Sequence, residues 1–125
     1  MMKKKLIMCI DDDEDALKAL TRALELRGYE VVATTSGEAA LEGLKTISPD
    51  LIITDLRMSP LNGFEVYVQV RKEQKHASVP FFFITAVDDD LARKYGHALG
   101  ADAYIEKPVD LDTLDSAIRK KLRLP

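Results

Sequence analysis

Short apolar runs that each end on a polar residue constrain the fold of this chain more than any other feature of its sequence. The central example is Leu51-Ile52-Ile53-Thr54-Asp55, which has Ser48-Pro49-Asp50 before it and Pro60 and Asn62-Gly63 after it. A short apolar run between such breakers is typical of a β-strand that is covered on both faces. We therefore expect a core strand that delivers the carboxylate of Asp55 to its carboxyl end.

Three other runs have the same form, and one further strand is expected from Glu30 to Thr34. The three runs are Lys3 to Ile10 ending on Asp11-Asp12-Asp13, Phe81 to Ile84 ending on Thr85, and Ala103 to Glu106 ending on Lys107-Pro108. Between the strands, apolar residues recur at helical spacing behind capping or breaking residues. The expected helices begin near Asp12 or Asp13, Ser36, Phe64, Asp88 and Asp110, and the fourth runs from Asp88 to Leu99.

Strands that alternate with helices at this spacing predict an α/β fold, a doubly wound, five-stranded parallel sheet in one domain over residues 1–125. The common strand order for such a sheet is 2-1-3-4-5, which places the first and third strands side by side. Ligands of these sheets bind at the carboxyl ends of the strands, where the strand order reverses. Asp11, Asp12 and Asp55 should therefore converge through topology alone.

Composition narrows the class of protein. Apolar residues make up 46% of the chain and charged residues 31%, the balance of a globular protein and not of a disordered tail. The net charge is −3 and no basic face is dense, so direct nucleic-acid binding is not expected. The apolar stretch Leu6 to Ile10 is too short for a signal peptide or a membrane span. Cys9 is the one cysteine of the chain and is expected as a buried thiol. Because a single cysteine cannot form a disulfide within the chain, we expect the protein to be cytoplasmic.

The polar strand ends suggest phosphoryl-transfer chemistry. Three carboxylates in one crevice repel one another, and Mg²⁺ or Mn²⁺ with its preference for oxygen ligands would relieve the repulsion. Lys107 adds a positive charge, and Thr85 adds a hydroxyl that can bind an oxyanion. Because Asp11 and Asp12 are adjacent and can share the metal, Asp55 is the expected nucleophile.

Several short motifs follow one another along the chain. They are Ile10-Asp11-Asp12-Asp13, Asp55 with Gly63 eight residues on, Thr85-Ala86, and Gly100-Ala101-Asp102-Ala103-Tyr104 leading to Lys107-Pro108. Together these motifs resemble the receiver domain of bacterial two-component response regulators, the CheY-like form of the flavodoxin-like fold, over essentially the whole chain. The resemblance implies a signalling phosphoprotein that assists its own phosphorylation and dephosphorylation and is not a turnover enzyme. A histidine kinase or a phosphotransfer protein would donate the phosphoryl group to Asp55.

The resemblance also implies roles for the neighbouring residues. The metal ligands would be Asp11, Asp12, Asp55 and the backbone carbonyl of Arg57, while Thr85 and Lys107 would contact the phosphoryl group. Tyr104 matches an aromatic residue that swings inward on phosphorylation, and Lys107-Pro108 matches a cis peptide bond. One departure concerns the loop after Asp55: the family places Met-Pro three and four residues after the acceptor, whereas this chain has Met58-Ser59-Pro60.

The expected output surface combines the helix over 88–99, the strand that carries Tyr104 and the last helix. It would contact an output protein or a fused effector domain, or form a homodimer. The basic side chains of the last helix have no other explanation in the sequence and would take part in partner choice; they are Arg119, Lys120, Lys121 and Arg123.

Two other functions stay open. The Met58-Ser59-Pro60 departure favours a pseudo-receiver, a binding module that works without phosphorylation. The pattern Asp11-x-Asp13 after a first strand resembles aspartate-based phosphohydrolases, in which Asp11 would be the nucleophile, although the chain is short for a substrate cap. His76 and His97 have no metal-ligand spacing, and we expect both at the surface.

Overall fold

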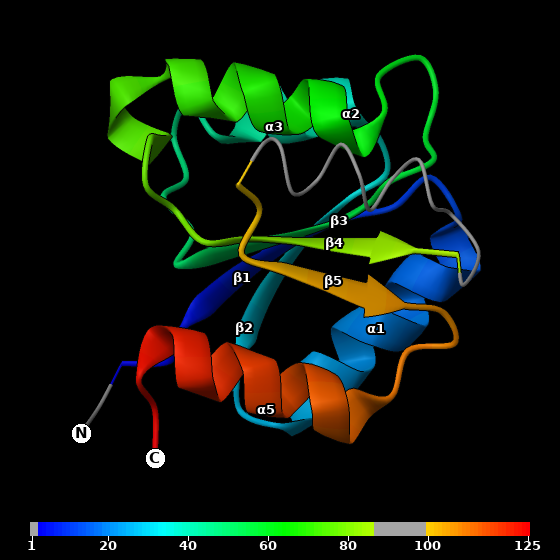
Figure 1. Cartoon of the computed structure of the whole chain (residues 1–125), viewed down its shortest axis with the longest axis vertical. Coiled ribbons are helices and arrows are strands. Elements are labelled where there is room, and N and C mark those ends of the chain that lie inside the picture. Colours follow the sequence, from blue (N-terminus) through cyan, green and yellow to red (C-terminus); the bar gives the residue numbers. More distant parts are fainter. Residues whose placement is uncertain (1–2, 87–99) are drawn as a thin grey trace.

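The computed structural model of the chain describes residues 3–86 and 100–125. Five strands form one sheet in the order β2-β1-β3-β4-β5, and every neighbouring pair is parallel. The predicted doubly wound sheet is thereby confirmed (Figure 1). The strands are β1 (Leu6–Ile10), β2 (Glu30–Thr34), β3 (Leu51–Asp55), β4 (Phe81–Thr85) and β5 (Ala103–Glu106).

Each described α-helix begins at a capping residue. The carboxylate of Asp13 caps α1 (Glu14–Leu26) by accepting the N–H groups of Asp15 and Ala16. Ser36, Asn62 and Asp110 cap α2 (Gly37–Gly43), α3 (Gly63–Lys72) and α5 (Leu111–Leu122), and a short 3-10 helix, η1 (Gln74–His76), follows α3. The helix that we expected over 88–99 lies outside the described residues.

Helices α2 and α3 cover one face of the sheet, and α1 and α5 cover the other (Figure 1). Successive residues of a strand point to opposite faces. In β1, Met8 and Ile10 therefore join the core with α2 and α3, while Ile7 and Cys9 join the core with α1 and α5. The predicted buried thiol of Cys9 is confirmed. Burial on both faces explains why β1, β3 and β4 are continuous apolar runs in the sequence.

The register of the sheet aligns the carboxyl ends of four strands. The last paired residues are Ile10 opposite Thr54, Asp55 opposite Ile84, and Thr85 opposite Glu106. Polar residues at or just after these positions therefore emerge at one edge of the sheet.

The surface position that we expected for His76 is wrong. The residue is only 5% exposed, and its Nε2 atom lies 2.7 Å from the carbonyl oxygen of Leu44 at the end of α2. Because a carbonyl can only accept a hydrogen bond, Nε2 is the protonated nitrogen. The ring thus satisfies one of the carbonyls that a helix leaves unpaired at its end. His97 lies outside the described residues.

Two of the basic side chains of α5 have structural partners that the sequence analysis did not foresee. Arg119 pairs with the buried carboxylate of Asp115 at 3.2 Å, and Lys121 pairs with Asp102 at 2.7 Å. Asp115 also accepts a hydrogen bond from the hydroxyl group of Tyr29 and pairs with Arg27. These contacts fasten α5 to the turn after α1 and to the loop before β5, whereas Lys120 and Arg123 are exposed.

Within residues 3–86 and 100–125, the structure has no helix with the length and apolar character that crossing a bilayer requires.

Candidate functional site

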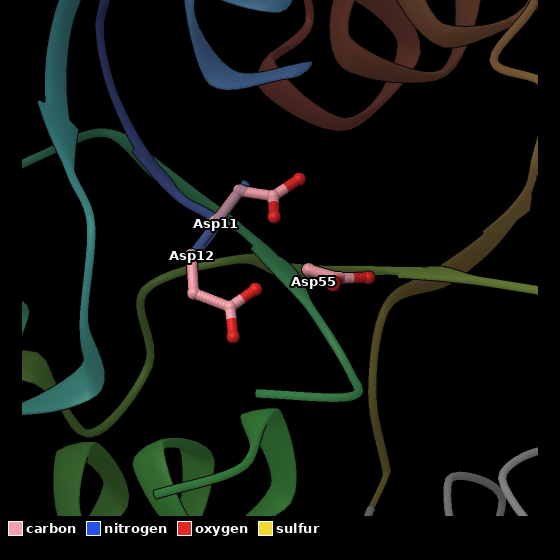
Figure 2. Close-up of side chains that lie close together, drawn as sticks. All are labelled: Asp11, Asp12 and Asp55. Carbon is pink, nitrogen blue, oxygen red and sulfur yellow. The ribbon is translucent and has the colours of Figure 1, made fainter. Parts of the chain in front are cut away.

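Three carboxylates meet at the carboxyl edge of the sheet. Asp11 and Asp12 follow β1, and Asp55 ends β3 (Figure 2). One oxygen from each of the three side chains lies within 4.8 Å of the other two. Asp11 and Asp55 are buried while Asp12 is exposed, so the cluster is open to solvent on one side. The structure therefore brings together the three acids that topology predicted to converge.

Asp11 is held by the chain that follows it. Its Oδ1 atom accepts the N–H group of Asp13 at 3.0 Å, which turns the backbone from β1 towards α1. Burial raises the pKa of Asp11, the Asp13 N–H group lowers it, the Asp55 charge raises it and the Lys107 charge lowers it, with a net upward shift. The charged form of Asp11 is thus disfavoured mainly by burial and further by the charge of Asp55, and a cation among the acids would favour it.

Lys107 supplies positive charge to the cluster. Its Nζ atom lies 3.1 Å from Oδ1 of Asp55, and the side chains of the two residues are 42% and 8% exposed. The backbone N–H group of Lys107 donates to the carbonyl oxygen of Thr85 at 2.8 Å, so Thr85 and Lys107 lie side by side. The Lys107-Pro108 peptide bond that follows is cis.

The hydroxyl group of Thr85 makes a weak hydrogen bond. The residue is 1% exposed, and its Oγ1 atom makes a long hydrogen bond of 3.4 Å to the carbonyl oxygen of Ala86. A bond at this limit is easily exchanged for a better acceptor. The Thr85 hydroxyl group could therefore exchange this bond for one to a better acceptor.

Tyr104 lies in β5, where it is paired with Phe83 of β4. Its ring is stacked on that of Phe83, with the ring centroids 5.5 Å apart. Its hydroxyl oxygen is buried and has no hydrogen-bond partner among the described residues. Burial, with a smaller effect of Tyr67, raises the pKa of Tyr104 to about 12, so the phenol is neutral at physiological pH. A buried, unpaired hydroxyl group is costly in this position.

The acidic cluster suits a small, hard divalent cation. Its ligand atoms are all carboxylate oxygens, and Mg²⁺ in proteins takes oxygen ligands, with one or two carboxylates and several waters. Asp11, Asp12 and Asp55 could hold such an ion. Arg57, whose carbonyl we expected as a further ligand, is an exposed residue of the loop after β3, and the Ser59-Pro60 bond of that loop is also cis.

A cleft of about 370 Å³ opens beside the cluster. Asp11 and Lys107 are part of its lining, and most of the remaining lining is apolar. The apolar residues come from α1, from β4 and from the segment after β5: Ala16, Ala19, Leu20, Ile84, Pro108, Val109 and Leu111.

Two residues next to Asp55 were not assigned a physical role from the sequence. Thr54 is fully buried, and its Oγ1 atom donates to the backbone carbonyl of Asp55 at 3.0 Å. Gly63, the first residue of α3, lies over the same carbonyl, since a Cβ atom at Gly63 would be 2.7 Å from the Asp55 oxygen. The features of the sequence that could have indicated these two contacts are a threonine directly before a strand-end acid and a glycine directly after a helix-capping asparagine.

The chain matches the family described as the response regulator receiver domain over residues 7–119. A structure of similar shape is the response regulator receiver protein from Pseudomonas putida, with a TM-score of 0.88 and 27% identity. The match covers 96% of this chain and 99% of the other.

Longer relatives contain a similar segment. The probable transcriptional regulator ycf27 of Porphyridium aerugineum is 38% identical over 122 residues, and the alkaline phosphatase synthesis transcriptional regulatory protein PhoP of Bacillus subtilis (strain 168) is 36% identical over 122 residues. Each match covers 98% of this chain and 50% of the relative. The chain thus spans about half the length of these relatives.

Proposed function

This chain belongs to the family of response regulator receiver domains of two-component signalling, and on that premise we propose that it acts as a phosphorylation switch with Asp55 as the phosphoacceptor. The observation that carries the proposal is the position of the Asp55 carboxylate. It lies in a cluster with two other carboxylates and 3.1 Å from the ammonium group of Lys107, at the edge of the sheet where ligands bind.

In the proposed reaction, a carboxylate oxygen of Asp55 attacks the phosphorus atom of a phosphohistidine on a histidine kinase or phosphotransfer protein. A new O–P bond forms while the P–N bond of the donor phosphohistidine breaks. Asp11, Asp12 and Asp55 would hold Mg²⁺, with the Arg57 carbonyl as a further ligand. When bound, the metal would neutralise charge on the transferring phosphoryl group.

Lys107 and Thr85 would position the phosphoryl oxygens. Lys107 already lies beside Asp55, and its charge would compensate part of the about −1.5 to −2 that phosphorylation adds. The Thr85 hydroxyl group would exchange its long bond to Ala86 for a phosphoryl oxygen. Movement of Thr85 would free space beside it for the ring of Tyr104, whose hydroxyl group has no partner in the described part of the chain.

The cleft beside the cluster supports docking of the phosphodonor, because its apolar lining leads to Lys107 and Asp11. The output surface would include β5 and α5 together with residues 88–99, and a homodimer could form through it. Since the named relatives are transcriptional regulators of about twice this length, the output partner would be an effector domain or a separate protein.

The proposal is tested by the intact mass of the protein after incubation with acetyl phosphate, with and without Mg²⁺. Wild type should gain one phosphoryl group only with Mg²⁺, and Asp55→Asn should gain none. A wild-type protein that gains no mass under either condition would overturn the proposal in favour of a pseudo-receiver. Release of phosphate that persists in Asp55→Asn would overturn it in favour of a phosphohydrolase that uses Asp11.

A further inference from the structure

The peptide group that follows Asp55 is held at both ends. Its N–H group, which belongs to Leu56, donates to the carbonyl oxygen of Ile84 at 3.0 Å. Its carbonyl group points to the opposite side, towards β1. There the ladder between β1 and β3 has ended, because its last pair is Ile10 with Thr54.

The Asp55 carbonyl oxygen lies past the last β1–β3 pair, so a hydrogen-bond donor for it has to come from outside that ladder. Gly63 lies so close to it that a Cβ atom would be 2.7 Å from the oxygen. Among the described residues, the one hydrogen bond to this oxygen comes from the hydroxyl group of Thr54, at 3.0 Å. Thr54 is completely buried, so water does not compete for this bond.

We propose that Thr54 is a positioning residue for the phosphoacceptor: its buried hydroxyl group fixes the peptide plane after Asp55 and thereby aims the Asp55 carboxylate. The inference rests on the proposed function of Asp55 and deepens it. Thr54 points to the α2 and α3 face of the sheet and Asp55 to the opposite face, because neighbouring strand residues alternate. Thr54 therefore acts through the backbone and does not touch the reacting atoms.

The geometry explains why a small rotation would matter. Asp55 ends its strand, so the Ile84 bond alone would let the plane pivot about the Leu56 nitrogen. A pivot moves the Asp55 Cα–Cβ bond and shifts the carboxylate relative to Asp11, Asp12 and Lys107. Displacements of about 1 Å at a reacting group can reduce a rate roughly 100-fold.

The test compares Thr54→Val, which keeps the shape and removes the donor, with Thr54→Ser, which keeps the donor. Ile52→Val is the matched control, since Ile52 is buried on the same face of the same strand and bears no hydroxyl group. The readouts are the rate of Asp55 phosphorylation by acetyl phosphate at saturating donor, and the affinity for Mg²⁺ from an NMR titration. Both are measured well below each unfolding midpoint, and Thr54→Ala replaces Thr54→Val if the valine variant does not fold.

We expect Thr54→Val to phosphorylate roughly 10- to 100-fold more slowly than wild type and to bind Mg²⁺ more weakly, while Thr54→Ser and Ile52→Val stay near wild type. Wild-type values in Thr54→Val, or a loss in Thr54→Ser equal to that in Thr54→Val, would overturn the inference. If wild type itself accepts no phosphoryl group, the proposed function fails, and the Mg²⁺ affinities still decide whether Thr54 positions the carboxylate.

Discussion

Replacing Gly63 with alanine should destabilise the protein, although the same change in a helix usually stabilises it. The new Cβ atom would lie 2.7 Å from the carbonyl oxygen of Asp55 and 3.1 Å from the Cα atom of Leu56. Both obstructing atoms belong to the backbone, so the start of α3 or the end of β3 has to move. Overpacking of this kind costs about 1–3 kcal/mol, and the loss of glycine flexibility returns about 0.5–1 kcal/mol. The difference between these two effects is a net loss of about 0–2.5 kcal/mol, centred near 1 kcal/mol.

Gly43 provides a matched control within the same chain. It also lies in a helix, α2, but the nearest atoms to an added Cβ atom are side-chain methyl groups of Met8 at 3.6 Å and Ile47 at 3.8 Å. These are ordinary van der Waals distances, so no clash opposes the entropic gain. Gly43→Ala should leave the free energy of unfolding unchanged or raise it by up to about 1 kcal/mol.

The assay is urea unfolding of wild type and both variants, with the phosphorylation rate of Asp55 as a second readout. We expect opposite signs for the two changes in unfolding free energy, and a slower phosphorylation in Gly63→Ala alone. A Gly63→Ala protein as stable as wild type would show that α3 does not press on the phosphoacceptor strand and would refute the packing argument.

Three further predictions follow from single contacts. Lys107→Gln removes the positive charge that lies 3.1 Å from Asp55, so phosphorylation by acetyl phosphate should slow roughly 100-fold. The free energy of unfolding in urea should change by less than about 1 kcal/mol. An unchanged phosphorylation rate would contradict the role of Lys107. Burial raises the pKa of Asp115, but hydrogen bonds from Tyr29 and Arg119 outweigh it and leave the pKa below its ordinary value of 3.8. The resulting stabilisation is complete above pH 3.8 and is lost as the pH falls through the lowered pKa. Asp115→Asn should therefore lower the free energy of unfolding by about 1–3 kcal/mol at pH 7, and this free energy should fall less than that of wild type on acidification. Parallel pH profiles of the two proteins would contradict this. His76→Leu leaves the buried Leu44 carbonyl unpaired and should cost about 1–3 kcal/mol in urea unfolding, whereas His76→Gln can still donate and should cost less; equal losses would show that the hydrogen bond is not the cause.

The strands and the helix starts were predictable because their causes are local. Burial on both faces makes β3 and β4 continuous apolar runs. Asp13, Ser36 and Asp110 mark helix starts through their own side-chain hydrogen bonds, whereas Asn62, which we interpreted as a breaker, caps α3. The meeting of Asp11 and Asp55 was predictable for a different reason. Few topologies are open to an alternating α/β chain, and the common one places β1 beside β3.

Residues whose surroundings come from distant segments were not predictable. The sequence neighbours of His76 are exposed and several are charged, whereas the partner of its buried ring is the Leu44 carbonyl, 32 residues earlier. Asp115 is paired with Arg27 and Tyr29 across more than 80 residues of sequence. The contact between Gly63 and the Asp55 carbonyl depends on how α3 docks. No local pattern encodes such contacts, because they arise when the layers pack together.

Chemical trapping of the acyl phosphate tests the central claim most directly. Wild-type protein is incubated with acetyl phosphate and Mg²⁺ and then treated with borohydride, which reduces an aspartyl phosphate to homoserine. Peptide mass spectrometry then locates the modified residue. We predict homoserine at position 55 and at no other aspartate, with the modification absent when Mg²⁺ is removed. Homoserine at Asp11 or Asp12, or its absence from every aspartate-containing peptide, would contradict the assignment of Asp55 as the phosphoacceptor.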